Sequence, residues 1–419
     1  LQLINKNGGL PVVLTNGDGS LFGVVSSGDI ASFLSEGSLK PLDHCIAEEV
    51  ANRQPVVAHL GDSQEVIEGY LSQHKIKVVP LIDNSQRVVR ILSSQDSFFK
   101  IGNITLDSDS PPLLIAEIGV NHNGELEEAK WLIQEASSAG CRVVKFQHRS
   151  STLYNKEDIN TFDLGAQYIY AEIERTRLSI KDLQDCCNFA RDQGLEVIVT
   201  PFDEKALKEL LESDICLSAL KIASCDLTNM PLIKQCAETG LPLIVSTGMS
   251  YEREIRATSL FLQSLLAEHA FLHCNSTYPS PATDINLSYI TRLREITKSV
   301  VGYSSHDGDA LIPCGAVAHG ARIIEFHITR SHELNGTDHR SSIQVSDLRK
   351  FVADCELMFR ACGNAIPRKP SQGELSNRQA LGKSYAYARA LNAGHVINAD
   401  DLLLMSPGSG YRYEELGQI

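Results

Sequence analysis

The chain has 419 residues, a formal net charge of −14, and a composition that is 43% hydrophobic and 21% charged. This balance predicts a soluble globular protein of two or three domains, and no apolar run approaches the roughly 20 residues that a membrane span needs. The negative charge argues against nucleic acid as a partner, so any anion site is expected to be local and enclosed.

The cysteine content restricts the cross-links and metal sites that the chain can form. There are eleven, an odd number, and no C-x-x-C motif occurs. Neither a disulfide framework nor a zinc knuckle is indicated, which favours a reducing, cytoplasmic location.

A weak repeat occupies the N-terminal hundred residues. The sequence LPVVLTNGDGSLFGVVSSGDI at 10–30 returns as KVVPLIDNSQRVVRILSSQDS at 77–97. Each copy predicts a strand, a polar turn, a second strand and then Ser-x-x-Asp, at Ser26/Asp29 and Ser93/Asp96. Residues 1–98 therefore resemble a tandem pair of CBS domains whose first copy lacks its opening helix and strand.

The CBS resemblance implies a regulatory or assembly module. In that family the Ser and Asp of the motif hold an adenine nucleotide, so an adenine nucleotide or a CMP-sugar is the implied ligand. The residues alone leave a second interpretation open, in which each Asp caps the helix that follows. The Ser, Asp, Gly and Pro residues of 99–110 then predict a linker.

Eight apolar runs lie between residues 111 and 330, separated by stretches of helical period. Uninterrupted Val, Ile and Leu is typical of parallel strands buried on both faces, and eight strand–helix units predict a closed (β/α)8 TIM barrel over 111–366. The runs are LLIAEIG, RVVKFQ, EVIVTPF, ALKIAS, PLIVSTG, AFLHCNS, SVVGYSS and RIIEFHIT. Their polar ends are expected to share the C-terminal rim, where the chemistry of such barrels takes place.

Two lysines follow unbroken apolar strands and are expected to project into the barrel mouth. An anionic ligand would keep buried Lys145 and Lys221 charged, which favours a phosphate or carboxylate site. A structural network with Glu117 and Glu325 is the competing interpretation. Neutral donors suited to phosphate oxygens stand at neighbouring strand ends: Thr200, Ser224, Ser246 and Ser304.

Two histidines end consecutive strands. His306 and His327 are one β/α unit apart, so their imidazoles would share one divalent ion with ligand oxygens and water. Spacing alone leaves open that both are ordinary buried residues.

Nine motifs in order closely resemble the sialic acid synthase family, over roughly residues 111–419. They are AEIGVNHNG, VVKFQ, TPFD, KIASCDLTN, VSTGM, LHCNSTYPSP, VGYSSH, EFHIT and GTDH. These enzymes condense phosphoenolpyruvate with an N-acylated mannosamine-type sugar to give a nine-carbon ulosonic acid and phosphate.

The resemblance implies a role for each matching residue. Glu117, Asp226, Lys145 and Lys221 would be catalytic, His306 and His327 would hold a divalent metal (Mn²⁺ or Mg²⁺), and the substrates would contact Gln147, Thr200, Ser224, Ser246, Ser276, Tyr278, Ser304 and Asp338. This chain departs from the usual pattern at Ser276, where the family has Asn, and at Asp226, where many members have Glu.

The C-terminal segment resembles the start of the family's antifreeze-like (SAF) domain. We expect a linker at 367–380 and a partial SAF domain at 381–419, which in the family covers the active site of a partner subunit and so implies a homodimer. Ser406 replaces the Arg that many members carry before Pro-Gly, which leaves room for a 2,4-diacetamido-2,4,6-trideoxyhexose as well as N-acetylmannosamine. Two alternatives remain: another phosphoenolpyruvate–aldose synthase, or a nucleotide-sensing protein with an inactive barrel.

Overall fold

The computed structural model describes residues 11–35, 47–62, 64–73, 76–93, 98–150, 174–363, 368–412 and 415. Within this part of the chain, no helix is both long enough and apolar enough to cross a membrane.

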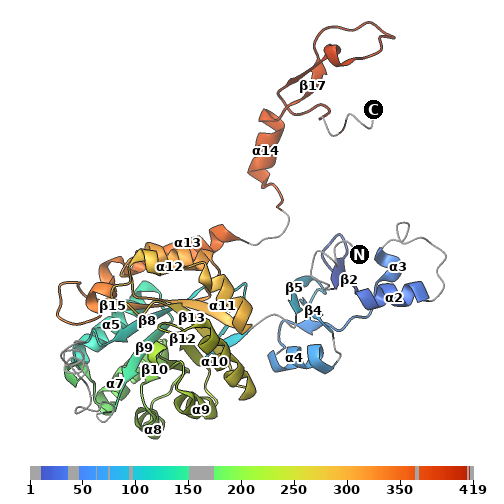
Figure 1. Cartoon of the computed structure of the whole chain (residues 1–419). Helices are drawn as coiled ribbons and strands as arrows, with labels where there is room; N and C mark the ends of the chain where they lie inside the picture. Colours follow the sequence, from blue (N-terminus) through green and yellow to red (C-terminus); the bar gives the residue numbers. More distant parts are fainter. Residues whose placement is uncertain are drawn as a thin grey trace. The chain divides into compact units, whose positions relative to one another are not determined.

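Eight parallel strands form a closed barrel, as the sequence predicted (Figure 1). Each strand pairs with the next, and the last pairs with the first. The strands are β8 (Leu113–Gly119), β9 (Val143–His148), β10 (Glu196–Pro201), β11 (Ala219–Ile222), β12 (Leu243–Ser246), β13 (His269–Cys274), β14 (Val300–Ser305) and β15 (Ile323–Thr329). A short strand, β16 (Ile343–Gln344), pairs in parallel with the end of β15 outside the ring.

Helices surround the barrel and bury one apolar stripe each. They are α5 (Leu126–Ala139), α7 (Ile180–Asp192), α8 (Glu204–Glu212), α9 (Met230–Glu238), α10 (Glu252–Ser264), α11 (Tyr289–Thr297), α12 (Leu311–Ala318) and α13 (Val345–Cys362). Helix α8 is representative: Asp203 caps its first turn by accepting a hydrogen bond from the Ala206 amide, and Ala206, Leu207 and Leu210 face the barrel. The cap satisfies a backbone donor that would otherwise have no partner.

The strand residues that point inward change character along the barrel axis. Near the N-terminal ends they are apolar, and Ile115, Ile198 and Ile244 belong to one buried cluster. Two residues further along the same faces, the inward positions are Glu117, Thr200 and Ser246. Because side chains alternate with a period of two in a strand, one face supplies both an apolar lower layer and a polar upper layer.

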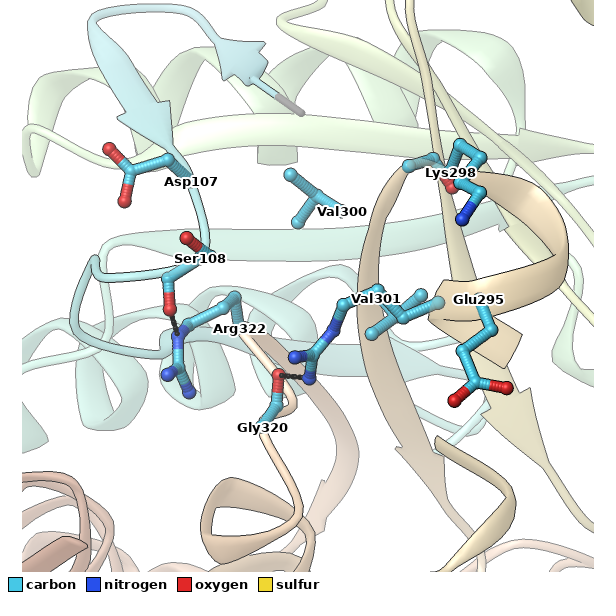
Figure 2. A pocket seen from close by; sticks show the side chains of 10 residues that line it. Asp107, Ser108, Glu295, Lys298, Val300, Val301, Gly320 and Arg322 are labelled. Atoms are coloured by element: carbon cyan, nitrogen blue, oxygen red, sulfur yellow. Dashed lines mark hydrogen bonds between the residues drawn. The ribbon is translucent and has the colours of Figure 1, made fainter. Parts of the chain in front are cut away.

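A hairpin closes the N-terminal end of the barrel. Strands β6 (Phe99–Ile101) and β7 (Ile104–Leu106) pair antiparallel, and their alternate apolar side chains join the lower cluster of the barrel. Arg322, just before β15, donates from Nε to the carbonyl of Ser108 at 2.7 Å (Figure 2). The linker expected at 99–110 was therefore wrong over 99–106, because the period-two pattern of Phe99, Ile101, Ile104 and Leu106 outweighs the surrounding polar residues.

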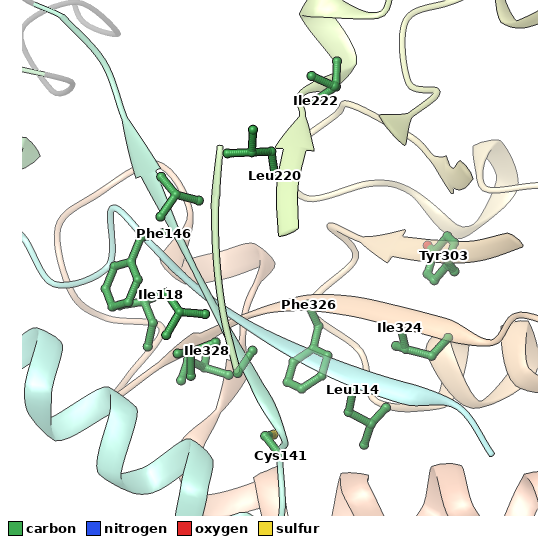
Figure 3. Close-up of a cluster of buried hydrophobic side chains, with 14 of the residues drawn as sticks. Leu114, Ile118, Cys141, Phe146, Leu220, Ile222, Tyr303, Ile324, Phe326 and Ile328 are labelled. Carbon is green, nitrogen blue, oxygen red and sulfur yellow. The ribbon is translucent and has the colours of Figure 1, made fainter. Parts of the chain in front are cut away.

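The outward strand residues pack beneath the helices. Leu114, Phe146, Leu220 and Phe326 lie in this outer cluster (Figure 3). The strands are thus buried on both faces, which explains their continuous apolar sequences.

The N-terminal module has a strand–turn–strand unit in each copy of the repeat. The first copy is β1 (Val12–Thr15), β2 (Leu21–Val25) and α2 (Ser27–Ser35), followed by α3 (Ala47–Val50). The second is β3 (Ala58–His59), α4 (Gln64–Gln73), β4 (Val78–Ile82) and β5 (Val88–Ser93). The turns of the two copies are joined by hydrogen bonds from the Leu21 amide to Gln86 and from the Val88 amide to Gly19. Assignment to the CBS family stays a prediction.

The second compact unit is Gly363–Ile419. It contains α14 (Gln372–Leu381) and an antiparallel pair, β17 (Ser384–Tyr387) and β18 (Leu402–Met405). The linker expected at 367–380 instead holds most of α14, because Ser371 and Glu374 form a reciprocal capping box at its start. The SAF assignment stays a prediction.

Candidate active site

A cavity of about 700 Å³ opens at the C-terminal ends of the barrel strands. It collects most of the residues predicted from the sequence, namely Lys145, Gln147, Thr200, Lys221, Ser224, Ser246, Ser276, Tyr278, Ser304, His306, Glu325, His327 and Asp338. A volume of this size lies within the usual range for small-molecule sites.

Lys145 lies in a buried carboxylate network. Its Nζ is 2.8 Å from Glu117 Oε2 and 3.6 Å from Glu325 Oε1, and it donates to Thr200 Oγ1 at 3.3 Å. Burial opposes the charge on Lys145, but Glu117 and Glu325 outweigh burial and raise its pKa. The competing structural network suggested by the sequence is therefore present around this lysine.

Lys221 has a different environment. Its Nζ donates to Ser246 Oγ at 2.6 Å and to the Ile222 carbonyl at 3.0 Å, and no described carboxylate lies within ion-pair distance. Burial lowers the pKa of Lys221, whereas Glu325 acts in the opposite direction. A buried ammonium that holds only neutral acceptors is suited to receive an anion.

Glu325 connects the two lysines electrostatically. It is 4% exposed, its Oε1 accepts from Ser304 Oγ at 3.0 Å, and its Oε2 has no hydrogen-bond partner among the described groups. Burial disfavours its charge, but Lys145 and then Lys221 outweigh burial and lower the pKa of Glu325 to about 2. The carboxylate therefore stays ionised beside both cations.

The two histidines face each other across the cavity. Their ring centroids are 5.4 Å apart. His306 Nδ1 contacts the Asn275 carbonyl at 2.7 Å, which makes Nδ1 the donor and leaves Nε2 directed at the Tyr278 hydroxyl, 3.1 Å away. His327 Nδ1 has no hydrogen-bond partner and lies 3.5 Å from Asp338 Oδ2.

The protonation of the two rings differs. Burial lowers the pKa of His327, so its imidazole is neutral and available as a metal ligand. Burial also disfavours a charge on His306, but Cys274 Sγ, 3.5 Å from Nδ1, opposes burial and raises the pKa of His306 to about 9. A cation bound at His306 Nε2 would displace a proton.

His306 and His327 form the candidate ligand pair in the part of the chain that the structure describes. Among the described residues, no group of three or more His, Cys, Asp or Glu side chains is arranged to hold a metal ion. Any cation between His306 and His327 would therefore take its remaining ligands from substrate and water, as in an open catalytic site.

The structure separates the two predicted catalytic carboxylates. Glu117 is fully buried beneath the cavity, where its Oε1 accepts from Gln147 Nε2 at 2.8 Å. Asp226 does not line the cavity: it lies in the short 3-10 turn Ser224–Asp226 and accepts from Asn229 Nδ2 at 3.0 Å. Spacing from the strand end could not distinguish these orientations, because the turn after β11 redirects the Asp226 side chain.

Some cavity residues were missed by sequence reasoning. Arg149 and Phe202 line the cavity, with the guanidinium 3.5 Å from the ring centroid. Arg149 follows β9 directly, so its position after a rim strand was the available signal. Thr176 lies before α7 and carries no motif that would mark it.

The nucleotide residues of the N-terminal module are only partly described. Ser26 and Asp29 bond reciprocally: the Ser26 amide donates to Asp29 Oδ2 at 2.7 Å, and the Asp29 amide donates to Ser26 Oγ at 3.2 Å. This is a helix cap at the start of α2, the second interpretation left open by the sequence. The side chain of Ser93 and the whole of Asp96 lie outside the described residues.

Comparison with known proteins agrees with the geometry. A family model described as the NeuB family matches residues 132–367. The chain is 34% identical over 319 residues to an N,N'-diacetyllegionaminic acid synthase of Legionella pneumophila, covering 73% of this chain and 88% of the relative. It is 28% identical to the N-acetylneuraminate-9-phosphate synthase of Homo sapiens, covering 73% and 86%.

A solved structure is similar over the same region. The N-acetylneuraminic acid synthetase of Leptospira borgpetersenii has 31% identity and a TM-score of 0.60, covering 67% of this chain and 95% of that one. On the family match, the sequence relatives and the barrel with its polar rim, the chain is an enzyme of the NeuB family of phosphoenolpyruvate-dependent condensing synthases.

Proposed function

We propose that the enzyme condenses phosphoenolpyruvate with an N-acylated mannosamine-type sugar, giving a nine-carbon ulosonic acid and phosphate. One observation carries the proposal. Lys221 is a buried cation without a described carboxylate partner, and it faces a cavity of about 700 Å³ that two histidines also line.

The lysines would bind the anionic substrate unequally. Lys221 has only neutral partners, the Ser246 hydroxyl and the Ile222 carbonyl, so a phosphate or carboxylate oxygen can replace Ser246 without separating an ion pair. Lys145 is held by Glu117 and Glu325, which fix its position and leave little net positive charge for a ligand. We therefore assign the stronger anion contact to Lys221.

Hydroxyl groups would complete the anion site. Thr200, Ser246 and Ser304 are all buried at strand ends around the lysines. Ser224 and Ser276 lie further out, where Gly248 permits their approach: a side chain at Gly248 would collide with both hydroxyl oxygens. Each hydroxyl can rotate its proton toward a phosphate oxygen without adding charge.

The residues present fit a divalent cation. The neutral ring of His327, its partnerless buried Nδ1 and the fixed tautomer of His306 are consistent with imidazole ligation. Mn²⁺ or Mg²⁺ bound there would act as a Lewis acid toward the sugar aldehyde. Asp338, 3.5 Å from His327 Nδ1, and Tyr278, stacked on His306, would orient the rings and meet the sugar.

The remaining chemistry needs a base beside the enol carbon. C3 of phosphoenolpyruvate would attack the aldehyde carbon, and water would then add at C2. Glu117, held by Gln147 and Lys145 beneath the cavity, is the carboxylate that we propose accepts the proton of that water. Cleavage of the C2–O bond would release phosphate and leave the 2-keto acid, with no Schiff base on either lysine.

The acceptor is proposed at the level of its class. Relatives include legionaminic, pseudaminic and N-acetylneuraminate-9-phosphate synthases, whose names imply different amino sugars. N-acetylmannosamine and a 2,4-diacetamido-2,4,6-trideoxyhexose are the two acceptors we propose. A homodimer in which the C-terminal unit covers the partner's active site would exclude water from the reaction.

A substrate panel tests the proposal. Enzyme, Mn²⁺ and phosphoenolpyruvate are incubated with N-acetylmannosamine, the diacetamido sugar and arabinose 5-phosphate, and products are identified by mass. A nine-carbon acid with one equivalent of phosphate is the expected result. An eight-carbon acid alone, or no product with any acceptor, would reject the assignment, and a borohydride-trapped lysine adduct would reject the mechanism.

A further inference from the structure

A second cavity lies at the opposite end of the barrel from the active site. Its volume is about 200 Å³, and it is lined by residues that precede β8, β14 and β15, among them Ser108, Lys298 and Arg322 (Figure 2). A water molecule occupies about 30 Å³ in the liquid, so this space holds several waters or one tetrahedral oxyanion.

Two partly buried arginines line this cavity. Arg322 donates from Nε to the Ser108 carbonyl at 2.7 Å and from Nη1 to the Ala321 carbonyl at 3.2 Å. Arg294 donates from Nη2 to the Gly320 carbonyl at 3.0 Å and to the His319 carbonyl at 3.4 Å. All these acceptors are neutral backbone groups, and none of the described carboxylates is within ion-pair distance of either guanidinium.

Several N–H donors remain on these side chains. A guanidinium has five donors, and no described group accepts from Nε or Nη1 of Arg294 or from Nη2 of Arg322. Burial lowers the pKa of both arginines, and the charge of Arg294 lowers that of Arg322 further. Asp109 and Asp107 act on Arg322 in the opposite direction. An anion placed between the two guanidinium groups would offset their mutual repulsion more directly.

The backbone is shaped for this arrangement. Gly320 has φ of +89°, and a side chain there would collide with the Arg294 guanidinium. Glycine thus lets Arg294 lie against the turn before β15. Of the acidic residues that line the cavity, Glu295 is 3.6 Å from Arg292 Nη1, and Asp107 accepts from the Asp109 amide at 2.8 Å.

We propose that this cavity is an accessory binding site for a phosphate-class oxyanion, held between Arg294 and Arg322. Arginine suits such a ligand because its planar fork matches two phosphate oxygens at once. The ligand is either inorganic phosphate or the phosphoryl group of a small phosphomonoester. Arg322 also donates a hydrogen bond to the Ser108 carbonyl. An anion bound to Arg322 would therefore fix the segment after β7 to the barrel.

Binding to the full-length protein tests the site. Equilibrium dialysis with radiolabelled inorganic phosphate is performed on Lys221→Met, which weakens the active-site anion contact, and on Lys221→Met combined with Arg294→Gln. We expect Lys221→Met to retain about one phosphate per chain and the added Arg294→Gln change to weaken it at least tenfold. Arg253→Gln, at an exposed position on α10 outside both cavities, should leave the affinity unchanged.

The opposite pattern overturns the proposal: phosphate binding that survives Arg294→Gln, or that falls equally with Arg253→Gln. Competition by methyl phosphate separates the two sources, because a site for phosphomonoesters binds it at least as tightly as phosphate. If Arg294→Gln fails to fold, crystals of the unmodified protein soaked in arsenate give a second test. Anomalous density between Arg294 and Arg322 supports the site, and density confined to the other end of the barrel refutes it.

Discussion

The two ends of the barrel use the same inward strand faces for opposite purposes. At the N-terminal end, Phe99 and Ile101 of the β6–β7 hairpin complete an apolar cluster with Ile115 and Ile198. At the C-terminal end, Lys145, Lys221 and other polar groups surround a cavity. Burial of apolar side chains stabilises the N-terminal end of the barrel. The C-terminal end holds charged side chains away from water, which lowers the stability of the fold unless a bound ligand neutralises them. Along such a strand, the apolar residue that stabilises the barrel and the polar residue near the active site are thus only two positions apart.

The largest expected effect is on chemistry at the polar end. His327→Ala should lower kcat/KM by about 10³-fold, since Lewis-acid stabilisation contributes several kcal/mol. Steady-state rates over a range of Mn²⁺ concentration give the measurement. His319→Ala, on the loop after α12, is the matched control. If His327→Ala or His306→Ala left the turnover rate unchanged, the assignment of that histidine as a metal ligand would be wrong.

The apolar end should respond in stability instead. Phe99→Ala should lower the free energy of unfolding by about 3–5 kcal/mol, because it leaves a cavity beneath the barrel. Urea unfolding gives the measurement, and the exposed neighbouring change Lys100→Ala should stay within about 0.5 kcal/mol of the parent. A Phe99→Ala protein of parental stability would show that the hairpin does not close the barrel. Its kcat/KM under folding conditions should be unchanged.

A smaller effect is expected when Lys221 loses its charge. Lys221→Met should raise KM for phosphoenolpyruvate by about 10- to 100-fold, the loss of one charge-assisted contact of about 1.5–3 kcal/mol. Initial rates at varied phosphoenolpyruvate give the value, with the exposed Lys234→Met as control. A normal KM would mean that Lys221 does not contact the substrate.

The smallest effect concerns pH. Glu325 has a pKa lowered from 4.5 to about 2, so its charge contributes stability that is fully present above about pH 4.5 and is lost as pH falls toward 2. The difference in unfolding free energy between the parent and Glu325→Gln should therefore shrink across that interval. Glu212→Gln, at an exposed position, supplies the reference. Parallel stability curves for parent and Glu325→Gln would show that the carboxylate is not held ionised by the lysines.

The sequence predicted those features of the fold and the cavity that depend on one dominant interaction. Continuous apolar runs predicted the eight strands, because burial on both faces leaves no alternative composition. The positions of Lys145, Lys221, His306 and His327 followed from their places at strand ends. The orientation of Asp226 did not, since a single turn decides whether a side chain enters the cavity or bonds to Asn229.

Two segments were misread because turn-forming residues masked a regular element. Polar residues around 99–110 concealed the hairpin, and Pro370 and Gly373 concealed the start of α14. In both, tertiary burial or a capping box outweighed local composition. Arg149 escaped notice because the residues that it approaches, such as Phe202, are distant in sequence.

The most direct test of the central claim is a crystal structure of the enzyme with Mn²⁺ and phosphoenolpyruvate. We predict anomalous density for manganese between His306 and His327, and an anionic group of phosphoenolpyruvate within hydrogen-bond distance of Lys221 Nζ. Manganese bound elsewhere, or phosphoenolpyruvate outside the cavity at the C-terminal end of the barrel, would contradict it.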